Sequence, residues 1–120
     1  MAWERFEDLE VWQDARELNR RIWSLIQRGC FSHDRPLSDQ INRSAGSAMD
    51  NVAEGFRSGT NPEFAKFVGY SQRSAAEVQS QLYRARDREH VNEVEFQDAM
   101  ELARKVERKS GGLIRHLRSS

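Results

Sequence analysis

Two carboxylates, Asp50 and Glu54, lie four positions apart in the second quarter of the chain. Paired carboxylates can carry out general acid–base chemistry when a histidine, cysteine or lysine accompanies them at a suitable spacing. No such residue accompanies this pair, and carboxylates one turn apart on a helix usually form a solvated face. We therefore expect no catalytic centre here, and a protein that is not an enzyme.

Cys30 and His33 have a spacing found among metal ligands, but no second pair of such residues accompanies them. We expect a buried thiol and a solvent-exposed histidine rather than a zinc site, and we predict no metal and no cofactor. Cys30 is the only cysteine, so an internal disulfide is excluded and a reducing compartment is expected.

Positive charge is concentrated at the end of the chain, although 19 basic and 19 acidic residues give a formal net charge of zero. Residues 89–103 contain acidic side chains and no lysine or arginine, whereas residues 104–120 contain a single glutamate. Basic side chains of this kind neutralise phosphates when a protein binds nucleic acid. The candidates for contacting RNA or DNA are Arg104, Lys105, Arg108, Lys109, Arg115 and Arg118.

A simpler interpretation of the same charge pattern is also open. Acidic residues at the start of a helix and basic residues at its end complement the helix macrodipole. Stacking of bases would require exposed aromatic rings, and residues 104–120 contain none. A net charge of zero also provides no large positive field that would attract a polyanion.

Apolar residues recur with a helical period along four segments, and no segment shows the alternation typical of strands. The predicted helices cover residues 8–28, 37–55, 61–88 and 92–118. Short connections between four helices favour an all-α, antiparallel up-down-up-down four-helix bundle. A chain of 120 residues suits one domain that covers residues 1–120.

Polar residues at the starts of three segments can accept hydrogen bonds from free backbone amides. The expected caps are Asp8 for the first helix, Thr60 or Asn61 for the third and Asn92 for the fourth. Glu63 and Glu95 each follow a candidate cap by three residues, which predicts a capping box at both places.

Two tryptophans, Trp12 and Trp23, lie on one stripe beside the apolar face of the first predicted helix. Their rings would extend the buried surface of this helix further around its axis than a minimal four-helix bundle requires. One interpretation is that they cover the seam of the chain's own bundle, and the other is that they form a contact between subunits.

The amino-terminal residues contain no apolar signal segment, and no run approaches the ~20 apolar residues that cross a bilayer. We therefore expect a cytoplasmic protein that has no contact with a membrane.

Several short segments together resemble one bacterial protein family. They are FEDLEVWQ at residues 6–13, SDQINRSA at 38–45, NVAEGF at 51–56, EFAKF at 63–67, AEVQSQL at 76–82 and GLI at 112–114. The most recognisable of them contains Asn51, Ala53, Glu54 and Gly55. The chain resembles the four-helix-bundle proteins encoded in intervening sequences of bacterial 23S ribosomal RNA genes, whose relatives include accessory variability proteins of diversity-generating retroelements.

The resemblance implies an antiparallel four-helix bundle that assembles into a ring of five subunits, and it brings no catalytic residues. For the retroelement relatives it also implies nucleic-acid binding and partnership with a reverse transcriptase. The chain departs from the family in having Met49 where proline is common, and in being neutral where those relatives are strongly basic.

These observations favour a non-enzymatic homo-oligomeric scaffold or adaptor, pentameric if it follows the family. Its basic surface would bind RNA, DNA or a nucleic-acid enzyme. The alternative is a purely structural or protein-adaptor ring that has no role with nucleic acid.

Overall fold

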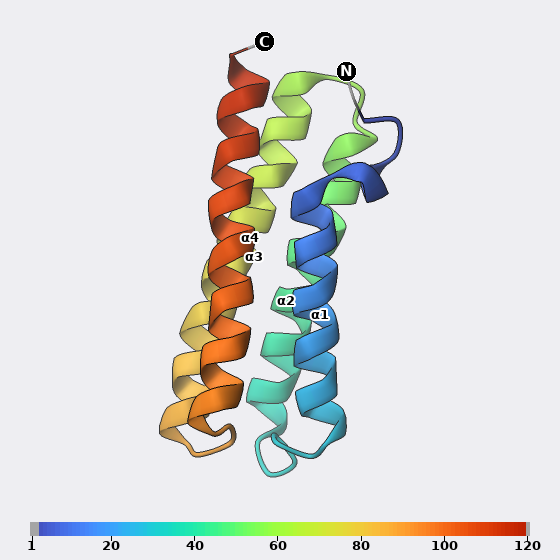
Figure 1. The fold of residues 1–120 in the computed structure, drawn as a ribbon. Coiled ribbons are helices and arrows are strands. Elements are labelled where there is room, and N and C mark those ends of the chain that lie inside the picture. Colours follow the sequence, from blue (N-terminus) through green and yellow to red (C-terminus); the bar gives the residue numbers. More distant parts are fainter. Residues whose placement is uncertain (1–2, 120) are drawn as a thin grey trace.

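Four long helices account for most of residues 3–119, which are the residues that this computed structural model describes. The helices are α1 (Glu10–Gln27), α2 (Arg35–Phe56), α3 (Asn61–Asp87) and α4 (Glu93–Arg118), and a short 3-10 helix, η1 (Phe6–Asp8), precedes them. Consecutive helices run in opposite directions, and the first and last described residues lie at the same end of the bundle (Figure 1). The described residues contain no strand, and the predicted all-α bundle is confirmed.

The apolar face of each helix points to one shared core that runs along the length of the bundle. Fully buried side chains come from every helix and include Leu18, Ile22, Ile41, Val52, Val78, Leu82 and Leu117. Helix α1 packs beside α2 and α4, and α3 packs beside the same two helices. The result is an elongated four-cornered bundle of 46 × 19 × 18 Å, in which each helix exposes its polar side.

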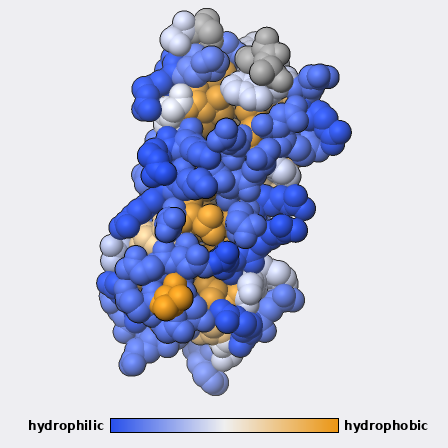
Figure 2. All heavy atoms as spheres, viewed as in Figure 1, coloured by the Kyte–Doolittle hydropathy of each residue, from blue (hydrophilic) through white to orange (hydrophobic). Residues whose placement is uncertain are grey.

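Ion pairs fasten α1 to α4 along the seam between them. Arg21 of α1 pairs with Asp98 of α4. Nearer the end of α1, Arg28 Nη2 lies 2.8 Å from Glu95 Oε2. Figure 2 shows that the face formed by α1 and α4 is mostly polar, with apolar side chains visible in hollows between the helices.

The start of α1 differs from the prediction. Asp8 does not cap α1, because its carboxylate accepts hydrogen bonds from the backbone N–H groups of Glu4 (3.0 Å) and Arg5 (3.1 Å) and so closes η1. Helix α1 begins at Glu10, and its N-cap, Leu9, supplies no side-chain hydrogen bond. The predicted start at residue 8 is therefore wrong by two residues.

The other three helices begin at polar caps. Thr60 Oγ1 accepts from the backbone N–H of Glu63, which identifies Thr60 as the cap of α3, but Glu63 does not complete the predicted capping box. Asn92 and Glu95 exchange two hydrogen bonds of 2.8 Å and confirm the predicted capping box of α4. Helix α2 begins two residues earlier than predicted, at Arg35, because Asp34 accepts from the backbone N–H of Leu37.

Candidate functional site

The basic residues of α4 fall into two groups that face different surroundings. The lysines point to α1, where Lys109 Nζ lies 2.9 Å from Glu10 Oε1 and 2.7 Å from Asp14 Oδ2. Lys105 Nζ lies 3.6 Å from Asp14 Oδ1. Hydrogen bonds with Asp14 and then with Glu10 raise the pKa of Lys109. Both lysines therefore hold α1 against α4 within the chain.

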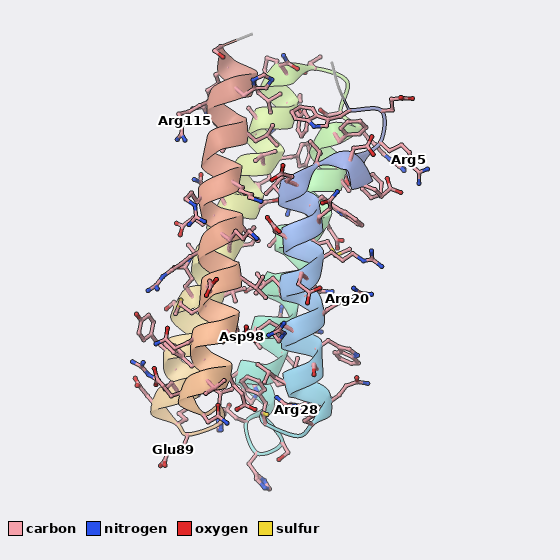
Figure 3. The ribbon with its side chains drawn as sticks, in the orientation of Figure 1. Arg5, Arg20, Arg28, Glu89, Asp98 and Arg115 are labelled. Carbon is pink, nitrogen blue, oxygen red and sulfur yellow. The ribbon has the colours of Figure 1, made fainter. Side chains whose placement is uncertain are left out.

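The arginines of α4 form the second group, which we call the arginine face: Arg104, Arg108, Arg115 and Arg118. All four are exposed, and none makes an ion pair with another residue among 3–119. Figure 3 shows the Arg115 side chain extending from α4 away from the bundle. Arg104 and Arg108 border a shallow depression of about 360 Å³ that also includes Gln97, Glu101 and Lys105. This surface can offer several guanidinium groups to an anion.

An exposed aromatic ring, Tyr83 of α3, was not among the residues singled out from the sequence. Its side chain is 43 % exposed, and its ring packs edge-on against Phe96 at 5.2 Å between centroids. Arg86 lies over both rings. Phe96 belongs to the acidic start of α4, so Tyr83 provides no stacking platform next to the arginine face.

The two predicted interface tryptophans have different environments. Trp12 is 9 % exposed and packs in the chain's own core, where its ring meets Phe6 edge-on at 5.1 Å. This arrangement supports the intramolecular interpretation for Trp12, because η1 covers that part of the stripe. Trp23 lies beyond the reach of η1 and is 48 % exposed. Only Trp23 of this pair keeps a large area that a second subunit could cover.

At the family motif, α2 packs closely against α3. A Cβ atom added at Gly55 would lie 2.9 Å from Phe67 Cβ and 3.1 Å from the Phe64 carbonyl oxygen. Asn51 donates from Nδ2 to the carbonyl and the hydroxyl oxygen of Ser47, both at 2.9 Å, and so stays on the α2 surface. Within the motif, Ala53 is half-buried and Glu54 is exposed. Gly55 therefore has a packing role.

The remaining sequence candidates are not assembled into a reactive centre. Cys30 is half-buried against the core rather than fully buried, and His33 is exposed as predicted. Asp50 and Glu54 are both exposed. Residues 3–119 contain no group of three or more His, Cys, Asp or Glu side chains with a geometry that would hold a metal ion.

A charged cluster ties together the two loops at the end of the bundle far from the termini. Asp34 Oδ2 lies 2.8 Å from both His90 Nε2 and Arg88 Nη1. Hydrogen bonds, first with His90 and then with Arg88, lower the pKa of Asp34 to about 2. Because Asp34 also caps α2, this cluster joins the α1–α2 connection to the α3–α4 connection and has a structural role.

Within the described part of the chain, no helix is both long enough and apolar enough to cross a membrane. A search of curated proteins finds no significant match. The family model described as 23S rRNA-intervening sequence protein matches residues 7–112. This match covers all of α1, α2 and α3 and most of α4. The chain therefore belongs to the family of 23S rRNA-intervening sequence proteins.

Proposed function

We propose that this protein is a non-enzymatic, homo-oligomeric scaffold that binds RNA or DNA through the arginine face of α4. The observation that carries the proposal is the contrast between the lysines of α4, which pair with acidic residues of α1, and the arginines, which pair with no described residue. Arginine forms bidentate hydrogen bonds with phosphate, and several phosphate contacts together produce salt-dependent binding.

The helix macrodipole accounts for only part of this surface. Its effect is confined to about the last turn of a helix. Arg115 and Arg118 lie in that turn, but Arg104 and Arg108 lie more than two turns before the end of α4 at Arg118. Arg104 and Arg108 are therefore the residues whose exposure favours a polyanion partner.

Symmetric assembly would strengthen binding. Each copy in a ring repeats the arginine face, so modest contacts by single chains add on one long nucleic acid. The resemblance to the family makes five copies the expected number, and we place the protein in the cytoplasm. A nucleic-acid enzyme such as a reverse transcriptase would then be a partner that shares the bound strand.

The test is a fluorescence anisotropy titration of a labelled single-stranded RNA and a matched duplex DNA across a salt series. Replacing both Arg104 and Arg108 by alanine should weaken binding and reduce the slope of log affinity against log salt by about two for each copy that contacts the strand. The control is the double substitution Arg35→Ala and Lys66→Ala, which removes the same charge from exposed positions outside α4. Binding should persist in the control.

Two outcomes would reject nucleic-acid binding by this face: no binding by the unaltered protein at low salt, or an equal loss in the control. The protein-adaptor ring would then be the better function. The zero net charge favours that alternative, because a neutral chain attracts polyanions weakly.

A further inference from the structure

A polar groove of about 680 Å³ runs between α2 and α3, the two helices that lie behind α1 and α4 in Figure 1. Its lining includes Gln40, Arg43, Ser44, Asp50, Glu77 and Gln81. Hydrogen bonds cross its floor from Gln81 Nε2 to Ser44 Oγ at 3.0 Å and from Ser74 Oγ to Ser47 Oγ at 3.1 Å. Polar side chains and their hydrogen bonds therefore form this part of the contact between α2 and α3.

The charged side chains that line the groove are two carboxylates, Asp50 and Glu77, and one cation, Arg43. Gln81 is only 6 % exposed, and its Oε1 atom has no hydrogen-bond partner, although its Nε2 atom donates to Ser44. Asp50 and Glu77 are exposed, and neither pairs with a cation among the described residues. A buried amide oxygen without a donor is unfavourable. A partner that brings N–H donors and positive charge would donate a hydrogen bond to Gln81 Oε1 and pair with the carboxylates of Asp50 and Glu77.

Such donors lie on the exposed side of α1, in a set that we call the α1 stripe: Arg16, Arg20 and Trp23. They follow one another at steps of four and three residues and so share one side of the helix. Arg16 lies over the Trp12 ring and has no carboxylate partner among the described residues, and Arg20 reaches Glu17 only at 3.8 Å. Trp23 is the more exposed of the two predicted interface tryptophans.

We propose that the α1 stripe of one copy docks into the polar groove of a second copy of this chain. This inference rests on the homo-oligomer of the proposed function and names the two surfaces that meet. The guanidinium groups of the stripe complement the carboxylates of Asp50 and Glu77, and one of them becomes the donor for Gln81 Oε1 after a small rotation of the amide. Trp23 then lies against Arg43, the cation in the groove.

The two surfaces present their groups in the same order along the bundle. Toward the loop that connects α1 to α2, the stripe reads Arg16, Arg20, Trp23, and α2 reads Asp50, then Arg43. The hydrogen bond between Gln81 and Ser44 places Gln81 near Arg43. Copies that stand parallel can therefore match all these groups at once.

The position of the surfaces favours a ring. The contact joins two different faces, and those faces are neighbours because α2 packs beside both α1 and α3. Each copy is consequently turned relative to the one before it, which allows head-to-tail contacts to close instead of extending as a straight filament. The arginine face belongs to α4, which contributes to neither surface, so it stays available to nucleic acid.

Charge reversal tests this pairing by particle mass, measured by light scattering after gel filtration. The groove reversal is Asp50→Arg with Glu77→Arg, and the stripe reversal is Arg16→Glu with Arg20→Glu. Each reversal alone should reduce the particle towards the 14.0 kDa of one chain. The four substitutions in one chain restore opposite charges and should restore the mass of the unaltered protein. All four side chains are exposed, and circular dichroism checks that each variant is folded.

The matched control, Arg104→Glu with Arg108→Glu, should keep the mass of the unaltered protein. A mass of 14.0 kDa for the unaltered protein would overturn this inference together with the homo-oligomer. Reversals that leave the mass unchanged, or a fourfold variant that stays dissociated, would overturn the inference alone. Restored mass in a protein that binds no RNA would uphold it while rejecting the nucleic-acid part of the proposed function.

Discussion

Cationic side chains on one helix have different neighbours according to their position around the helix axis. Lys105 and Lys109 lie one turn apart and both reach Asp14 on α1. Arg108 precedes Lys109 by one residue, or about 100° around the axis, and points away from that seam. The sequence predicts the block of positive charge, but the division into paired and unpaired residues depends on where α1 lies.

Replacing Lys109 by alanine should lower the free energy of unfolding by about 1–2 kcal/mol, because the largely buried Asp14 carboxylate loses its nearest cation. Replacing Arg108 by alanine should change it by less than about 0.5 kcal/mol. Urea denaturation measures both. Equal losses in the two variants would mean that Arg108 also has a structural partner.

The Asp34 cluster should make stability depend on pH in the acid range. The pKa of Asp34 is lowered from 3.8 to about 2, so its contribution is complete above about pH 4 and is lost as the pH falls towards 2. Asp34→Asn keeps an acceptor for the Leu37 amide but removes the charge. The unaltered protein should lose more stability than this variant between pH 4 and pH 2, as measured by urea denaturation at each pH. Parallel curves would contradict the assignment.

At the scale of elements, the junction of α2 with α3 explains why one glycine belongs to the most recognisable motif. Gly55 is buried against the first turns of α3, where a side chain would meet Phe67 and the backbone of Phe64. A resemblance to a family identifies the motif without giving this reason, because the close approach appears only when both helices are in place.

Gly55→Ala should destabilise the protein by about 1–3 kcal/mol, since backbone atoms of α3 would have to move. Gly69→Ala is the matched control, because its Cβ would meet no atom within 4 Å. The control should gain up to about 1 kcal/mol from helix propensity. Thermal unfolding of both variants provides the comparison, and similar behaviour of the two would disprove the packing role of Gly55.

The start of α4 could be predicted because its two capping residues bind each other across a spacing of three residues. Asn92 and Glu95 satisfy each other locally, and the prediction from their spacing is correct. Asp8 has free amides on both sides, and the ones it binds precede it. The spacing of residues does not show whether Asp8 binds the amides before it or those after it, so the start of α1 could not be predicted from this residue.

At the scale of the whole molecule, the segment before α1 closes one end of the bundle. The Trp3 ring lies edge-on to His116 of α4, 5.8 Å between centroids, and shares a hollow of about 370 Å³ with Leu9 and Leu113. It also borders Phe56 and Phe64 near the α2–α3 turn. The same segment buries Trp12, which is why Trp12 and Trp23, although they lie on one side of α1, have different exposure.

Trp3→Ala should therefore lower the free energy of unfolding by about 1–2 kcal/mol, because the variant loses a half-buried ring that packs beside α4 and near the α2–α3 turn. Trp23→Ala should have a smaller effect in the isolated chain. Chemical denaturation of both variants under conditions that dissociate any oligomer measures the difference. A larger loss for Trp23→Ala would show that the end of the bundle does not depend on Trp3.

Helices that alternate in direction bring the first and last described residues to the same end of the bundle (Figure 1). A short linker between the present ends, with new ends opened in the exposed loop around His33, would give a circular permutant that keeps all four helices. Such a rearranged chain should still fold. In a ring of parallel copies, proteins fused to either original end would all project from one rim.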